Sequence, residues 1–335
     1  MNLNRTRWIF ATLGTLLAIL FWILLSPSFL KDPNPILVRI EKKQSLQQIA
    51  HLLKEKGVIR SSAFFQVLSQ ITGKSRRFRY GTYQLERDHD WQLIRQLELG
   101  DTYKVKVTLP EGWTSTQIAE RLTQAGILSN SHSFVELVQK SQTEGMLFPE
   151  TYFFELQSDP EEIVQAMVRQ FKKNWSTPFQ TRAQELKMSQ KEILTLASII
   201  EREAELDPER AKISSVYHNR LRKKWLLEAD PTVQYALSEG RFWKDHLTYH
   251  DLKIDSPYNT YRIRGLPPAP ICNPGLKSIQ AALYPQETPF LFFVADGTGG
   301  HAFSTTHEAH LKIQQENKRR LLKKSEFSSW YIVSP

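Results

Sequence analysis

The sequence predicts an α+β protein with one N-terminal transmembrane helix, a small α+β module, and a mixed α+β domain built around a central helical stretch. Three observations carry this prediction: an uncharged run near the N-terminus, an internal repeat in residues 36–138, and three helix-start signals in residues 187–240. The expected domains are 1–30 for a cytoplasmic tip and anchor, 31–103 for the module, 104–325 for the larger domain and 326–335 for a tail. A chain of 335 residues is long enough for two or three domains.

The run from Trp8 to Leu30 carries no charged residue and is long enough to span a bilayer as a helix. Arg5 and Arg7 precede it, so we expect the N-terminus in the cytoplasm and the bulk of the chain outside. A cleaved signal peptide is the alternative, but its apolar core is typically shorter than this run. Ser26-Pro27-Ser28 is also a poor cleavage site, so an uncleaved anchor is favoured.

Composition and charge narrow the classes of partner. The net charge of +9 suits an acidic polymer, an anionic membrane or nucleic acid, and nucleic acid ranks last because no nucleic-acid-binding motif is present. A single cysteine excludes an intrachain disulfide and a Cys-rich zinc site. His307 and His310 have i,i+3 spacing, whereas a zincin helix needs i,i+4, so we expect no metal site and no cofactor.

Residues 36–138 contain two copies of one pattern at a constant offset of 69. Each copy predicts a strand, an amphipathic helix ending at a glycine, and a second helix, with a further strand at 79–85 between the copies. The first copy resembles a LysM-type glycan-binding module, although a plain α+β spacer between membrane and main domain explains the pattern equally well. The matched positions are Val38, Ile40, Gln48, Ile49, Ala50, Leu53, Gly57, Ile59, Phe65 and Leu68 with Val107, Leu109, Gln117, Ile118, Ala119, Leu122, Gly126, Leu128, Phe134 and Leu137.

The central stretch predicts three capped helices. Ser189 and Glu192 form a capping box, which starts the first helix at about Gln190. Asp207-Pro208 and Asp230-Pro231 each supply an N-cap and a first-turn proline for the next two helices, and Gly240 can close the third.

One carboxylate of this stretch lies on an apolar stripe. Glu201 follows Leu194, Ala197 and Ser198 at helical spacing, so it is expected to point inward or into a cleft. Apolar surroundings disfavour the charged form of a carboxyl, which suits a general acid. The neighbouring Glu203 is expected on the solvated side.

The alternative for Glu201 is a purely structural role, as the partner of a nearby arginine such as Arg220 or Arg262 in a buried ion pair. Structural ion pairs also occupy such positions.

A long irregular segment, residues 255–275, follows the helices. It is rich in Tyr, Asn and apolar residues, which argues against disorder. Aromatic faces stack on sugar rings and amides bond to hydroxyls, so a glycan-binding loop is favoured over a rigid structural crossover. The candidate substrate-binding residues are Ser256, Tyr258, Asn259, Thr260, Tyr261 and Arg262, together with Asp230.

Several motifs occur together in order: 147-LFPETY-152, 196-LASIIE-201, 230-DPTV-233, 256-SPYNTY-261, 265-GLPP-268 and 300-GHAFS-304. In this combination the chain resembles the endolytic murein transglycosylases of bacteria, the YceG-like family, over essentially its whole length. The resemblance implies a catalytic domain in residues 104–325 that cuts peptidoglycan glycan strands internally, with Glu201 as the catalytic residue. It further implies 1,6-anhydro-muramic acid ends, termination of nascent strand elongation, and a periplasmic domain anchored in the inner (plasma) membrane. Peptidoglycan synthases are possible protein partners.

One position departs from the family pattern. Glu228 stands where the resemblance leads us to expect glutamine, which adds a carboxylate near the expected site. Hydrolytic glycosidases use two carboxylates that face each other across the bond. Glu205 and Glu201 project from the same side of one helix, so they cannot easily do this, whereas a lytic mechanism needs one carboxyl. A hydrolytic muramidase using Glu228 or Asp230, and a non-catalytic peptidoglycan-binding scaffold, remain as alternatives.

Overall fold

The computed structural model describes residues 12, 14–15, 34–244, 246–297 and 299–330. The predicted membrane run at 8–30 lies almost wholly outside these residues. None of the helices within the described ranges combines the length and apolarity that crossing a bilayer requires. The chain divides into two compact units, one up to Val105 together with Phe153–Leu156, the other formed by Lys106–Tyr152 and the residues after Leu156.

The first unit is built from β1 (Ile36–Ile40), α2 (Leu46–Glu55), α3 (Ser62–Ile71), the 3-10 turn η1 (Ser75–Arg77), β2 (Gly81–Leu85) and α4 (Asp90–Leu99). Strands β1 and β2 pair antiparallel, with Ile36 opposite Leu85. The three helices supply apolar side chains to one core with the inward faces of the strands. Its fully buried members include Val38, Leu53, Phe65, Tyr83 and Leu97.

The second copy of the repeat adopts the same order: β3 (Lys104–Leu109), α5 (Ser115–Gln124), α6 (His132–Ser141) and β4 (Glu150–Glu155), with β3 paired to β4. The expected strand–helix–helix pattern is therefore present in both copies. Each first helix begins with a capping box, Ser45 with Gln48 and Thr114 with Gln117, again 69 residues apart.

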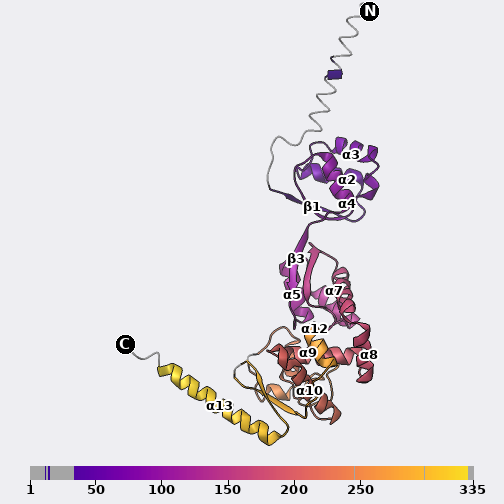
Figure 1. Cartoon of the computed structure of the whole chain (residues 1–335). Coiled ribbons are helices and arrows are strands. Elements are labelled where there is room, and N and C mark those ends of the chain that lie inside the picture. Colours follow the sequence, from indigo (N-terminus) through magenta and orange to yellow (C-terminus); the bar gives the residue numbers. More distant parts are fainter. Residues whose placement is uncertain (1–11, 13, 16–33, 245, 298, 331–335) are drawn as a thin grey trace, which may run out of the picture. The chain divides into compact units, whose positions relative to one another are not determined.

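The second unit continues with α7 (Pro160–Asn174), α8 (Thr177–Glu185), α9 (Gln190–Glu203), η2 (Asp207–Glu209), α10 (Arg210–Arg222), α11 (Asp230–Ser238), η3 (Asp251–Lys253), α12 (Leu276–Leu283), β5 (Phe292–Ala295), β6 (His301–Ser304) and α13 (His307–Trp330). Helix α9 lies among α8, α10 and α12 (Figure 1). Every residue of α9 from Ile193 to Ile200 is buried, so this helix is the centre of the unit's core.

The three helix starts are close to those predicted, with differences at the caps. The capping box at Ser189 is present and α9 begins at Gln190, as expected. Asp230 is not an N-cap: it is the first residue of α11, Ala229 precedes it as the cap, and the Tyr261 hydroxyl donates to the Asp230 carboxylate at 2.6 Å. Asp207 likewise opens the 3-10 turn η2 ahead of α10 and does not cap it. The Asp230 carboxylate is thus bonded to a distant residue and not to its own helix, whereas Asp207 accepts bonds from Arg210 at the start of α10 and from Lys277.

Gly145→Ala is expected to destabilise the protein more than Gly265→Ala. Both glycines have left-handed backbones, with φ of +84° and +86°, which cost an L-residue about 1–2 kcal/mol. A Cβ at Gly145 would also lie 2.5 Å from Cγ of the rigid Pro270 ring, whereas nothing lies within 4 Å at Gly265. The melting temperatures of the two variants measure the difference. Equal decreases in melting temperature would show that the loop before β4 can shift to accommodate the added methyl group.

Candidate active site

Glu201 lies in the last turn of α9, and its side chain is only 6% exposed. The predicted inward orientation is therefore confirmed. Its carboxylate accepts hydrogen bonds from the Gly275 N–H at 2.9 Å and from Arg210 Nη1 at 3.3 Å. Arg210 is itself buried and also bonds to Asp207 and Ser278. The ion-pair alternative thus has a concrete partner, although it is Arg210 and not Arg220 or Arg262, and the catalytic role of Glu201 stays a prediction.

A second acid, Glu111, reaches the same place from the turn after β3. A Cβ on Gly275 would meet its Oε1 at 1.9 Å, so Glu111 packs directly against the backbone that binds Glu201. Burial raises the pKa of the Glu111 carboxyl, and the charge of Glu201 adds to this increase. Glu201 is therefore surrounded by charged groups that are themselves held in place, Arg210 and Glu111.

Glu203, two residues later, does not lie on a solvated face, and that expectation was wrong. The Tyr217 hydroxyl donates to its Oε1 at 2.8 Å. Burial raises the pKa of Glu203 to about 7, and the charge of Asp230 contributes to the increase, while the hydrogen bond from Tyr217 and the charge of Arg220 oppose it. A carboxyl with this pKa still carries its proton in a large fraction of molecules at neutral pH.

Glu203 borders a cavity of about 380 Å³. The wall is formed by the chain before and at the start of α11, by β5 and the start of β6, and by α13. Charged and aromatic groups from these segments converge on it: Arg220, Glu228, Asp230, Tyr261, Phe292, Phe293, His301, His307 and His310. The cavity brings the protonatable carboxyl of Glu203 together with charged side chains, such as Arg220 and Asp230, and with aromatic rings. This composition suits the binding and cleavage of a sugar polymer.

The cation of this cavity is fixed in place. Arg220 is 7% exposed, and its guanidinium donates to the carbonyls of Leu291 and Leu227 at 2.7 and 2.8 Å. It also pairs with Glu228 at 2.9 Å. The unusual carboxylate at position 228 is therefore neutralised by a buried arginine at the cavity wall.

The predicted substrate-binding residues separate into four groups. Asp230 and Tyr261 line the Glu203 cavity, whereas Ser256 and Tyr258 line a different cavity of about 960 Å³. Arg262 lies on the surface and donates to the Lys253 carbonyl at 2.7 Å.

Asn259 and Thr260 form the fourth group, and both have no exposed surface. The Asn259 amide donates to the carbonyls of Leu252 and Ile254, and the Thr260 hydroxyl accepts the Ala229 N–H. Their polar groups are used within the protein, which corrects the expectation of direct ligand contact: they hold the loop in position. Polar side chains in a loop look alike in sequence whether they face a ligand or the loop's own backbone.

Metal chemistry finds no support among the described side chains, since no group of three or more His, Cys, Asp and Glu residues there could hold an ion.

Most of the chain is similar to known proteins. A family model described as the YceG-like family matches residues 38–316. A Bacillus subtilis protein named endolytic murein transglycosylase is 35% identical over 323 residues, which are 88% of this chain and 88% of that protein. A Streptococcus pneumoniae protein of the same name is 26% identical over 314 residues, covering 82% of this chain and 56% of that protein.

A crystal structure of a yceG-like protein from Listeria monocytogenes is similar in fold, with a TM-score of 0.54 at 32% identity, and the match covers 84% of this chain and 99% of that one. The family model spans both units and every motif discussed above. The chain therefore belongs to the YceG-like family.

Proposed function

We propose that the protein is an endolytic murein transglycosylase, a lyase that cleaves peptidoglycan glycan strands internally. The observation that carries this proposal is a single protonatable carboxyl, Glu203, at a cavity lined by Asp230 and Tyr261. The names of the two relatives support the same reaction and substrate.

The chemistry needs one carboxyl in two successive steps. Protonated Glu203 donates its proton to the glycosidic oxygen, and the C1–O bond of the muramic acid breaks. The resulting carboxylate then takes the proton from the C6 hydroxyl as that oxygen bonds to C1, which leaves a 1,6-anhydro end. Tyr217 holds one carboxyl oxygen, so the other is free to face the sugar. Asp230, held by Tyr261, places negative charge beside the developing positive charge at C1.

Glu201 is the competing candidate for this role. Both of its oxygens already accept hydrogen bonds, from Arg210 and from Gly275. Glu201 also lines neither of the two cavities, whereas Glu203 borders one of them. We therefore favour Glu203 for proton transfer and Glu201 for holding α9 against α10 and the start of α12.

Product analysis tests the proposal. Purified protein is incubated with murein, and the fragments are separated and weighed by mass spectrometry. Anhydro ends identify lytic cleavage. Reducing ends would identify a hydrolytic muramidase, with Asp230 or Glu228 as the second carboxylate, and the absence of products would identify a binding scaffold.

The rate of strand cleavage is expected to fall as the pH rises through about 7. The first step requires the protonated form of Glu203, and burial sets the pKa of this carboxyl at about 7. The measurement is kcat/KM on murein across the neutral range in a buffer of constant ionic strength. A rate that stays constant through two pH units above neutrality would assign the transferred proton to another group.

Two further expectations remain proposals. We infer that residues 8–30 anchor the chain in the inner (plasma) membrane with the catalytic domain on the periplasmic side, where peptidoglycan lies. Protease treatment of intact spheroplasts tests this, because only an external domain is digested. We also infer that the first unit is a LysM-like module; its strand–helix–helix–strand order and antiparallel β1–β2 pair support this, and retention on glycan strands tests it.

A further inference from the structure

A second cavity of the second unit, about 960 Å³, is separate from the one that contains Glu203. Its wall comes from α5 and α6 of the second repeat copy, the first turns of α9, the second half of α11 and the proline-rich loop. It shares no lining residue with the Glu203 cavity. Cavities of this size hold ligands as large as a short peptide.

The two cavities are nevertheless neighbours, because the same two segments border both. On α11, Asp230 lines the Glu203 cavity and Tyr235 lines the larger one, and five helical residues span about 7–8 Å. On the loop that follows η3, Tyr258 and Tyr261 are divided in the same way, and three residues span at most about 11 Å. Helix α9 also borders both cavities, with Lys191 in its first turn and Glu203 twelve residues later, about 18 Å along the helix axis. A branch of a ligand whose reacting bond lies at Glu203 must extend over about that length to reach Lys191.

The lining of the larger cavity carries charges of both signs. Lys191, in the first turn of α9, is exposed and makes no ion pair within the described part of the chain. Arg241, the other cation, pairs with Glu239 of the same lining at 3.2 Å, and Glu136 is a further exposed acid there. Glu144 supplies an acid at the wall, where it accepts the Ser115 N–H at 3.0 Å and the Asn273 amide at 2.7 Å. Burial raises the pKa of Glu144 to about 7. In peptide-bearing murein the lactyl carboxyl of muramic acid is bound as an amide, so the glycan backbone is uncharged and does not need these groups for binding.

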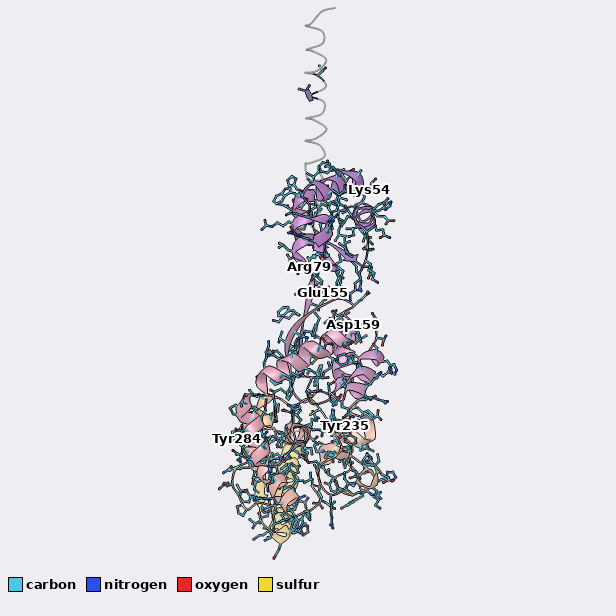
Figure 2. All side chains as sticks on the ribbon, turned by 90° about the vertical axis from the view of Figure 1, so that its right-hand side faces the viewer. Lys54, Arg79, Glu155, Asp159, Tyr235 and Tyr284 are labelled. Atoms are coloured by element: carbon cyan, nitrogen blue, oxygen red, sulfur yellow. The ribbon has the colours of Figure 1, made fainter. Side chains whose placement is uncertain are left out.

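Aromatic groups complete the lining. The rings of Tyr235, labelled in Figure 2, and Tyr258 lie 4.8 Å apart between centroids. They form an apolar face beside the charged groups. Such a face suits the short aliphatic side chains and methylene groups of a peptide, with its carboxylates directed to Lys191 and its amine to Glu144.

We propose that this cavity binds the stem peptide of peptidoglycan, the short zwitterionic peptide that branches from muramic acid. The inference rests on the proposed function, since it assigns a second part of the same substrate. It makes the enzyme selective for strands that still carry their peptides.

The test compares two substrates: murein strands with their peptides, and the same strands from which an amidase has removed them. Full-length wild-type protein is expected to cleave the peptide-bearing strands with a kcat/KM about tenfold higher or more, the effect of one charge-assisted contact. Lys191→Glu should lose this preference by raising KM on peptide-bearing strands only. Glutamate is well tolerated in the first turn of a helix, so folding is preserved.

Lys172→Glu is the matched control: it makes the same charge change at an exposed position of α7 outside both cavities, and should behave as wild type. If Lys191→Glu raises KM equally for both substrates, the cavity binds the glycan and not the peptide. If it changes KM for neither substrate, the cavity binds no part of the strand. Either result overturns the proposal. If the wild type cleaves neither substrate, the proposed function fails, but binding of the peptide can still be tested. The protein is then titrated with a synthetic stem peptide, and binding is monitored by tyrosine and tryptophan fluorescence.

Discussion

Replacement of Glu203 by glutamine is expected to abolish strand cleavage while leaving the fold intact. Glutamine keeps the shape of the side chain, and its amide oxygen can still accept the Tyr217 hydroxyl, but it has no proton to transfer. General acid–base catalysis contributes about 10² to 10⁴-fold, and one group serves both steps here, so the loss should reach the upper end. Anhydro-muropeptide release and thermal melting are measured on the same preparation.

The pH dependence of stability gives this variant an independent signature. The folded protein retains the Glu203 proton up to a pH of about 7, whereas the unfolded carboxyl loses it near its ordinary pKa of 4.5. The folded state binds more protons between these two values, so this group lowers the stability of the wild type as pH rises through that window. Glutamine does not ionise, and Glu203→Gln should therefore gain stability relative to wild type above pH 7 but not below 4.5.

Glu201→Gln is the matched control, two residues earlier on the same helix. It removes the anionic partner of the buried Arg210, which keeps only Asp207, and should cost about 1.5–3 kcal/mol of stability. Measurable cleavage should remain. The opposite pattern, with normal melting and no products from Glu201→Gln but residual products from Glu203→Gln, would return the catalytic role to Glu201.

Asn273→Ala is expected to cause the largest loss of stability, about 3–5 kcal/mol. Asn273 has no exposed surface, and its side chain accepts the N–H groups of Gly145 and Leu147 at 2.8 and 2.9 Å. It donates to the Trp113 carbonyl at 3.0 Å and to Glu144. Alanine leaves two buried N–H donors without partners, and each costs about 1–3 kcal/mol. Urea unfolding measures the change in free energy.

The control for this prediction is Asn130→Ala, an exposed asparagine whose side chain accepts only local bonds from Ser133. It should cost less than about 1 kcal/mol. If the two variants unfold at the same urea concentration, water must replace the lost contacts at Asn273, and the segment before β4 is not held by that amide.

Local signals predicted the helices and the repeat well, because the information lies within a few residues. The capping box at Ser189 starts α9 where expected. The repeat pattern also predicted the two amphipathic helices that the structure begins after Ser45 and Thr114. The inward stripe of α9 was also predicted correctly, since helical spacing determines which side chains share a face.

Sequence periodicity failed at Glu203, because it describes one helix and not what covers it. The face of α9 that carries Glu203 is covered by Tyr217 of α10, and the cavity there is walled by β5 and β6, residues 292–304. No pattern around residue 203 reveals partners that lie so far along the chain. The sequence also could not predict which residues of the candidate loop line each cavity and which are buried within the loop. Tyr258, Thr260 and Tyr261 all carry a hydroxyl group, and nothing in the sequence separates their environments.

The return of Phe153–Leu156 to the first unit constrains how the protein can be made. The Glu155 carboxylate accepts the Thr102 hydroxyl at 2.6 Å, and the Leu156 carbonyl accepts Arg39 Nη1 at 3.3 Å, so the N-terminal unit uses residues synthesised well after Val105. At about 5–20 residues per second, the ribosome delivers them roughly 3–10 seconds after the rest of that unit. During this interval the nascent N-terminal unit lacks its bonds from Thr102 and Arg39 to residues 155 and 156, and these bonds form only after the second copy of the repeat has been synthesised.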